Sequence, residues 1–283
     1  MTQEEYYHKI VERYMQFCAH NAKDLDAAFA SLPTVASSDA TRNPPAAAPA
    51  PPNAGKQSQQ RQPSTELSII LLSLRKLREA IVATASSVPI VSSQRVFVFS
   101  IRLSILAQHP PSYFPSLKYL LGHLHTSTHP LSEPELREFV SYLILDYACR
   151  QNDMVAAFEL RARAKSRYAM KMQTVDRVLA ALMHDNWVIF WRVRNSVDSY
   201  MRAILNWASD RVRRHALKAV GSAYLNADLP WIVQGCTGDK DGWPWEKLVE
   251  VEGLGWQKQD NKVIIRIPKR KAVQQSGQSK QDS

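Results

Sequence analysis

The stretch that decides the fold begins with Ser209-Asp-Arg-Val-Arg-Arg-His-Ala-Leu-Lys-Ala-Val220, a basic segment whose spacing predicts a helix that continues to Tyr224. Asp228-Leu-Pro-Trp-Ile-Val233 then leads into a loop. The next segment, Trp245-Glu-Lys-Leu-Val-Glu-Val-Glu-Gly253, has the pattern of a short amphipathic helix. This part of the chain is therefore predicted to contain at least two helices before any strand.

Two short strands are expected after these helices, in Leu254-Gly-Trp-Gln-Lys258 and Lys262-Val-Ile-Ile-Arg-Ile267. A polar turn at Gln259-Asp-Asn261 separates them. Helices that end in two short strands around a polar turn form a winged helix, a module that usually docks on protein or nucleic acid and carries no chemistry. Residues 209–271 are therefore predicted to form a winged-helix module with a small β-hairpin.

The composition is that of an ordinary globular protein, with 283 residues of which 45% are hydrophobic. Its three cysteines, Cys18, Cys149 and Cys236, stand far apart, which favours a reducing compartment over a disulfide framework or a metal knuckle. The first seven residues are polar and acidic, unlike a secretory signal. No apolar run approaches the roughly 20 residues that a membrane span needs. We therefore expect a soluble intracellular protein that does not bind membranes.

The net charge is +10 and the pI is about 9.6, a balance that attracts polyanions. The positive residues are spread over several predicted helices and the C-terminal residues, however, and do not gather in one segment. Nucleic-acid contact, solubility and binding to acidic protein partners all remain open as explanations of this charge.

The N-terminal part has the pattern of a helix followed by a linker. Apolar residues recur at helical spacing from Gln3 to Asn21, and a second short helical piece follows from Ala22 to Leu32. Residues 33–65 are rich in Pro, Ala, Ser and Gln, a composition that predicts a disordered linker because it buries little and proline lacks a backbone donor. The first helix is therefore tethered, and it either docks on the rest of the chain or binds elsewhere.

Residues 66–208 are predicted to be a body of successive helices joined by short polar turns. Thr65, Ser132, Asp153 and Thr174 are the expected capping residues. The expected helices include Gln94–Gln108, Ser112–Leu124, a helix from Ser132 to Cys149, Met154–Tyr168, Val175–Met183, Trp187–Arg194, Val197–Trp207 and Ser209–Asn226. Such a series is typical of an α-solenoid, although no repeat of fixed length is present.

The expected fold is thus mainly α, a helical-repeat solenoid that ends in a C-terminal winged helix. The corresponding segments are 1–32 as a helical piece, 33–65 as a linker, 66–208 as the helical body, 209–271 as the winged helix and 272–283 as a disordered tail.

No sequence motif indicates an enzyme or a cofactor site. The chain lacks a phosphate-binding glycine loop, a nucleophile elbow, a kinase signature and an HExxH motif. His123, His125 and His129 lie close in sequence, but no Asp, Glu or Cys completes a metal shell at a standard spacing, so they are interpreted as solvated side chains. Cys149 is interpreted as a core residue. We therefore expect a non-catalytic protein with no cofactor and no metal.

Three groups of basic residues are candidates for contact with nucleic acid or an acidic partner. Arg161, Arg163, Lys165 and Arg167 alternate along a helix end and are expected to be solvated. By contrast, Arg211, Arg214 and Lys218 share one helix face, where they could grip phosphates, bind an acidic helix or only face solvent. The tail residues Lys269, Arg270 and Lys271 form a short basic run, typical of an import signal, a nucleic-acid patch or a solubilising terminus.

Four tryptophans, Trp231, Trp243, Trp245 and Trp256, lie in and around the predicted winged helix. Most are expected in the core of this small module, and any tryptophan left outside would be a good interface anchor. Trp243 and Trp245 are taken as candidates for protein contact.

Several apolar and aromatic patterns resemble the PCI superfamily, the helical-repeat and winged-helix domains of the proteasome lid, the COP9 signalosome and initiation factor 3. They comprise Asp185-Asn-Trp-Val-Ile-Phe-Trp191, the helix around Tyr200, the helix from Asp210, Tyr224, and Leu229-Pro-Trp-Ile-Val233, within about Leu131 to Lys271. The chain looks most like the short branch with COP9 signalosome subunit 8, a small proteasome-lid subunit and subunit k of initiation factor 3. The mRNA-export scaffolds of the GANP type share this core.

The resemblance implies a non-catalytic scaffold or adaptor that joins other PCI-type subunits in the cytoplasm and nucleus. PCI-type domains typically line up their winged-helix sheets edge to edge, and the strand from Lys262 to Ile267 is the expected exposed edge, with Lys262, Ile264 and Arg266 as contact candidates. The alternative is a nucleic-acid-binding adaptor in mRNA processing or nuclear export.

Overall fold

The computed structural model describes residues 2–32, 63–85, 87–239 and 242–266. Within these residues it is mainly helical, with twelve α-helices, one π-helical turn and one small antiparallel sheet of three strands. The chain separates into two compact units. The N-terminal unit comprises Met1–Leu179 and Ser196–Trp207, and the C-terminal unit comprises Ala180–Asn195 and Ala208–Ser283.

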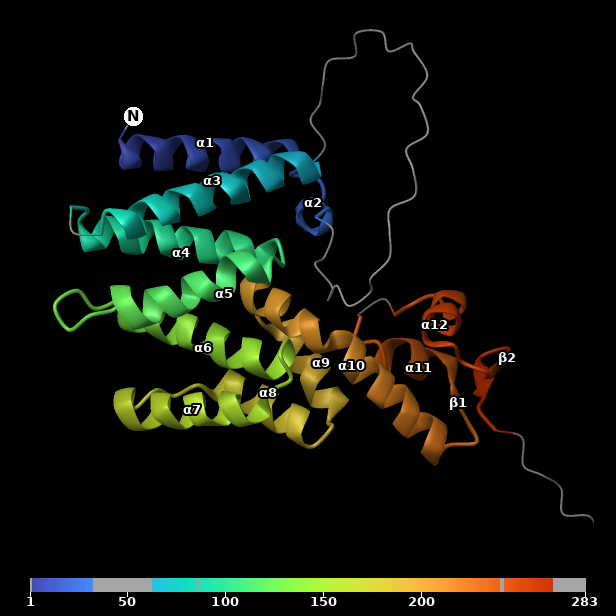
Figure 1. The fold of residues 1–283 in the computed structure, drawn as a ribbon. Helices are drawn as coiled ribbons and strands as arrows, with labels where there is room; N and C mark the ends of the chain where they lie inside the picture. The colour runs from blue at the N-terminus through green and yellow to red at the C-terminus, as the bar shows by residue number, and fades with distance from the viewer. Residues whose placement is uncertain (1, 33–62, 86, 240–241, 267–283) are drawn as a thin grey trace, which may run out of the picture. The chain divides into compact units, whose positions relative to one another are not determined.

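In the N-terminal unit, helices that follow one another in the chain pack side by side in successive layers (Figure 1). Helix α1 packs on α3, α3 on α4, α4 on α5, and α6 on α7. The elements are α1 (Gln3–His20), α2 (Leu25–Ala30), α3 (Pro63–Ala83), α4 (Ile90–Leu106), α5 (Pro110–Tyr119), the π-helical turn η1 (Leu120–Leu124), α6 (Glu133–Cys149), α7 (Met154–Tyr168), the first part of α8 (Gln173–Met183) and the first part of α10 (Ser199–Ala223).

The core of this unit comes from apolar side chains at helical spacing. Leu67, Ile70 and Leu74 of α3 are fully buried because they lie three and four residues apart on one face. The carboxylate of Asp146 on α6 is fully buried as well. It accepts a 2.6 Å hydrogen bond from the Tyr113 hydroxyl on α5, and its two oxygens each lie 2.7 Å from a nitrogen of Arg150. These bonds compensate the loss of water around the carboxylate and join α5 to α6.

The N-terminal helix docks on its own unit, which answers the question that the sequence left open. The Arg13 guanidinium binds both oxygens of Glu66 on α3, at 2.9 and 3.3 Å. The Gln3 side-chain amide donates to the Thr84 hydroxyl at 2.9 Å, next to the end of α3. Ile10 of α1 is buried as well. The helix α1 is therefore an integral layer of the N-terminal unit.

Several predicted boundaries were confirmed and others were wrong. Asp153 caps α7 as predicted, with its carboxylate accepting from the Ala156 amide at 2.9 Å, and Ser132 is the N-cap residue of α6. Residues 33–62 of the predicted linker lie outside the described residues. Pro63–Thr65, however, already belong to α3, because proline is favoured at the first helical position; Thr65 is therefore not the cap.

The two helices expected at Val197–Trp207 and Ser209–Asn226 are one continuous helix, α10. A buried stripe through Leu205, Ala208 and Val212 runs across the predicted break, and serine costs little inside a helix. Pro110 and Pro111 also begin α5, where the sequence indicated only the end of the preceding helix.

The C-terminal unit consists of the end of α8, α9 (Trp187–Ser196), the rest of α10, β1 (Asn226–Asp228), α11 (Leu229–Gly235), α12 (Trp245–Glu252), β2 (Gln257–Gln259) and β3 (Lys262–Ile264). The sheet order is β1-β3-β2, and both pairings are antiparallel. The sequence predicted the hairpin of β2 and β3 but missed β1 and α11. A three-residue strand is too short to show alternation. The sequence described Asp228–Val233 only as leading into a loop, whereas most of this segment lies in the seven-residue helix α11.

A separate hydrophobic core holds this unit together. Leu217 and Val220 of α10, Leu248 of α12, and Val263 and Ile265 of the last strand segment are buried in one cluster. Val263 and Ile265 stand two positions apart, so alternation along the strand turns both toward this core. The side chains packed against the cluster include Trp243, Trp245 and Trp256, in agreement with the expectation that most tryptophans lie in the core.

Candidate docking surfaces

The last strand is not the exposed edge that the sequence indicated. β3 lies between β1 and β2, and its residues Lys262–Ile264 pair with Asp228–Asn226 on one side and with Gln259–Gln257 on the other. The prediction was wrong because β1 was not recognised in the sequence, and the hairpin alone leaves one side of β3 open. The backbone groups of Lys262 and Ile264 are therefore used inside the sheet, although the Lys262 and Arg266 side chains are exposed.

The two true edges of the sheet differ in character. All three residues of β2, Gln257–Gln259, are exposed and polar, and a lysine on an edge strand disfavours pairing with another chain. The other edge is β1, and no strand of the described residues pairs with its outer side. β1 is also bordered by apolar side chains, which makes it the better candidate for strand pairing.

These apolar side chains form an exposed cluster that we call the edge patch, defined as Tyr224, Leu225 and Trp231. Their exposed fractions are 49%, 53% and 43%. The Tyr224 and Trp231 rings meet edge to face, with centroids 5.7 Å apart. The Leu225 carbonyl accepts from the Ile265 and Arg266 amides at 2.8 and 3.1 Å, so the backbone below the patch is fixed to the sheet.

Trp231 and Tyr224 were recognised in the sequence, but not as parts of one site. The available signal was the spacing in α11. Ile232 is fully buried, whereas its neighbour Trp231 lies on a different side of this seven-residue helix and is exposed.

Helix α10 also carries a buried cation, Arg213, that was not recognised in the sequence. The Arg213 and Glu252 side chains are each only 6% exposed and lie 2.7 Å apart, from Nε to Oε1. Arg213 Nη2 also binds Asp210 at 2.8 Å. The Arg213 guanidinium lies 4.1 Å from the centroid of the Trp243 ring, and the Lys247 ammonium lies 4.3 Å from it. This cluster fixes α12 against α10, and it gives Trp243 a packing role.

The position of Arg213 could have been found from spacing. It shares a helical stripe with Leu217 and Val220, which are both buried. The neighbouring charges in the run Arg211–Arg214 concealed this pattern.

The three candidate residues for nucleic-acid contact on α10 are not equivalent. Arg214 and Lys218 are exposed and Arg211 is half-buried. Arg214 Nε lies 3.9 Å from Glu252 Oε2, so a carboxylate already stands beside one of the cations. This face therefore carries mixed charge. The remaining candidates, Lys269, Arg270 and Lys271, lie outside the described residues.

The interface candidate Trp245 is half-buried against the core of the C-terminal unit. Ile264 is half-buried on the sheet, and Arg266 follows the sheet with an exposed side chain. Lys262 and Ile264 therefore lie on β3, and Arg266 lies two residues after it. Trp243 and Trp245, at the start of α12, instead pack against the core of the C-terminal unit.

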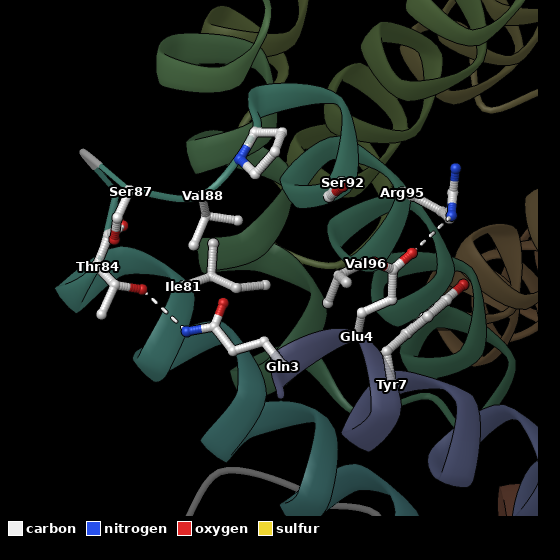
Figure 2. A pocket seen from close by; sticks show the side chains of 11 residues that line it. Gln3, Glu4, Tyr7, Ile81, Thr84, Ser87, Val88, Ser92, Arg95 and Val96 are labelled. Carbon is white, nitrogen blue, oxygen red and sulfur yellow. Dashed lines mark hydrogen bonds and ion pairs between the residues drawn. The ribbon is translucent and has the colours of Figure 1, made fainter. Parts of the chain in front are cut away.

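The N-terminal unit contains a pocket of about 370 Å³ between α1, α3 and α4 (Figure 2). Ile81, Val88 and Val96 supply apolar side chains to its lining. Gln3 hydrogen-bonds Thr84 across one side, and Glu4 Oε1 faces Arg95 Nη1 at 3.9 Å across another. These two contacts join α1 to the end of α3 and to α4.

A second and larger groove of about 540 Å³ lies on the same unit, between α1, α4, the segment before α6 and the start of α10. Its wall is aromatic, with Tyr7, Tyr14, Phe99 and Tyr200 among the lining residues. Burial, the largest cause in each case, raises the pKa of Tyr7, Tyr14 and Tyr200 above the usual value for tyrosine. Their hydroxyls are therefore protonated at neutral pH.

Within the described residues, no group of three or more His, Cys, Asp or Glu side chains is arranged to hold a metal ion. His125 Nδ1 accepts from the Leu131 amide at 3.1 Å, and His129 Nδ1 lies 3.1 Å from the Thr128 hydroxyl. Cys149 is buried, which confirms its interpretation as a core residue. Across the same residues, no helix is long and apolar enough to span a bilayer.

Comparison with known proteins adds no relative: no family model matches the chain, and no curated protein matches its sequence.

Proposed function

We propose that this chain is a non-catalytic scaffold or adaptor subunit of the PCI type, which joins a multi-subunit complex through a winged helix in its C-terminal unit. The layered helices of the N-terminal unit would be the helical-repeat body of such a subunit. The assembly would be of the proteasome-lid, COP9 signalosome or initiation-factor-3 kind.

The order of elements in the C-terminal unit supports this proposal. Helix α10 is followed by β1, two helices and the β2–β3 hairpin, and the sheet order is β1-β3-β2. A winged helix has this same succession of helix, strand, helix, helix, strand and strand, with the last strand in the centre. The strand β1, which the sequence did not reveal, therefore strengthens the original interpretation.

The single observation that carries the docking role is the open side of β1 next to the edge patch. The register shows which backbone groups are available. Leu225 accepts from Ile265, and Leu229 donates to Asn261, so Leu225, Ala227 and Leu229 direct their backbone toward β3. Since direction alternates along a strand, Asn226 presents its amide and carbonyl outward. Asp228 presents only its amide, because its carbonyl begins helix α11 as the N-cap.

A partner strand would extend the sheet at β1 and cover the edge patch. Strand addition supplies main-chain hydrogen bonds, and side-chain pockets supply specificity. Tryptophan and tyrosine dominate binding energies in protein interfaces because they bury a large, rigid area. Together, Trp231, Tyr224 and the outward groups of β1 form a surface that suits a protein partner.

The test is affinity purification of the full chain from cells, with mass spectrometry and matched proline variants on the two edges. Asn226→Pro removes an outward amide on β1, where a proline leaves the ladder with β3 intact. By the same alternation, the Lys258 amide points outward on β2, so Lys258→Pro is the matched control. We expect a stable set of partners with wild-type chain and Lys258→Pro, and its loss with Asn226→Pro. Equal recovery of partners with both variants would contradict docking at β1.

A further inference from the structure

The aromatic groove of the N-terminal unit has a wall built from rings that stand at right angles to one another. The Tyr7 and Tyr14 rings, both on α1, meet the Phe99 ring of α4 edge to face, at centroid distances of 5.8 and 5.4 Å and interplanar angles of 88° and 81°. Tyr200 lines the same groove, and so does Pro130. These rings make this side of the groove aromatic.

The groove contains hydroxyls and charged side chains. Arg95 is one of its lining residues and faces Glu4 at 3.9 Å. The Arg102 guanidinium is bound by both oxygens of Glu138, at 2.9 and 2.7 Å, and so carries little free charge. Glu135 is a lining residue, and its carboxylate accepts from the Ser132 hydroxyl at 2.7 Å. The protonated Tyr7 and Tyr200 hydroxyls are donors, and the Tyr14 hydroxyl bonds Cys18. A groove of aromatic faces with donors between them suits a polyproline II segment, whose carbonyls have no partners within the segment.

The same chain contains a sequence of this kind, outside the described residues. Asn43-Pro-Pro-Ala-Ala-Ala-Pro-Ala-Pro-Pro-Asn53 has five prolines, and Pro49-Ala-Pro-Pro52 has the PxxP spacing of groove ligands. Arg42 precedes it, with a charge complementary to that of Glu135. We propose that the aromatic groove on α1 and α4 binds the chain's own proline-rich segment, Arg42–Asn53.

The tether allows this contact. Residues 33–43 separate the segment's first proline from Leu32, and an extended chain spans about 3.3 Å per residue, or roughly 36 Å. The 18-residue helix α1, which forms one wall of the groove, is only about 27 Å long at 1.5 Å per residue. Both anchors of the segment, α2 and α3, pack against each other in the same unit. A tethered ligand of this kind has an effective concentration on the order of mM, so even a weak site would be filled.

This inference is independent of the docking role of β1, because every residue that it uses lies in or is tethered to the N-terminal unit. Its test uses a full-length chain in which Asn43–Asn53 is replaced by glycine and serine in equal number. The probe is a synthetic peptide with the sequence of residues 42–56, and binding is followed by fluorine NMR of chains labelled with 3-fluorotyrosine. We expect saturable binding to the replaced chain, with shifts at Tyr14 and Tyr200, and binding to the wild-type chain that is at least about tenfold weaker.

Two further variants keep the result interpretable. A peptide with Pro49→Ala and Pro52→Ala should lose at least about tenfold in affinity, and this change cannot affect folding of the protein. In the replaced chain, Tyr14→Ala should weaken the peptide, whereas Tyr168→Ala on the exposed end of α7 should not. Absence of saturable binding, or equal binding of the substituted peptide, would overturn the proposal. Equal affinity for the wild-type and replaced chains would overturn it too, because the groove would then take proline-rich ligands only from other molecules.

Discussion

The buried pair of Arg213 and Glu252 offers a quantitative test of how the C-terminal unit is held together. In Glu252→Ala, the Arg213 guanidinium stays buried against the Trp243 ring and loses its closest carboxylate, at 2.7 Å. Breaking a buried ion pair on one side costs about 3–5 kcal/mol. Asp210, 2.8 Å from Arg213 and mostly exposed, compensates in part, so we expect a loss near the low end, about 3 kcal/mol.

The matched control removes both charges. In the double variant Arg213→Met with Glu252→Leu, no unpaired charge is left, and hydrophobic replacement of a buried pair is often close to neutral. We therefore expect the double variant to recover most of the loss. The assay is urea unfolding followed by tryptophan fluorescence, which reports mainly on the C-terminal unit because Trp207 alone among the seven tryptophans belongs to the other unit. A loss of unfolding free energy below about 1 kcal/mol in Glu252→Ala, the range of exposed pairs, would refute the reasoning. A double variant whose loss equals the sum of the losses of Arg213→Met and Glu252→Leu would refute it too.

Three further predictions concern the sheet, the pH dependence and the thiols. Ile265→Asp should destabilise the C-terminal unit by several kcal/mol because it buries an unpaired charge, whereas the half-buried Ile264→Asp should cost less; urea unfolding decides, and the reverse order would mean an inverted register. Burial, followed by the charge of Arg78, lowers the pKa of His109 below its usual 6.5, so the unfolded chain binds more protons. The free energy of unfolding should therefore fall as the pH drops below about 6.5, and His109→Gln should reduce this slope; an unchanged slope would contradict the assignment. Burial raises the pKa of Cys236 to about 12, and Cys149 is buried too, so a thiol reagent should modify half-buried Cys18 first and the other two only after unfolding. Prompt reaction of all three thiols would show that the cores are open.

The sequence predicted most helices because their signals are local. The caps at Ser132 and Asp153 and the apolar stripes of α6 and α7 lie within a few residues of one another, so they could be recognised without the fold. The hairpin of β2 and β3 was found for the same reason, from an apolar run beside a polar turn.

What the sequence could not supply depends on contacts between distant residues. β1 has three residues, and it is a strand because β3, more than 30 positions later in the chain, pairs with it. Without β1, the strand Lys262–Ile264 was mistaken for an edge. In a similar way, Arg213 looked like one of several surface cations, because its partner Glu252 lies 39 residues away. The edge patch likewise depends on the fold, because Tyr224 follows the end of α10 and α11 places Trp231 beside it.

The central claim is that the open side of β1, with the edge patch, docks a protein partner. It is tested most directly by the partners that copurify with the full chain carrying Trp231→Ala, compared with Val251→Ala. Both side chains are exposed in the C-terminal unit, and Val251 lies on helix α12, which belongs neither to the sheet nor to the edge patch. We predict that Trp231→Ala loses a defined set of partners, with unfolding unchanged, while Val251→Ala retains it. Retention of the same partners by both variants, or a wild-type chain that is recovered alone as a monomer, would contradict the account.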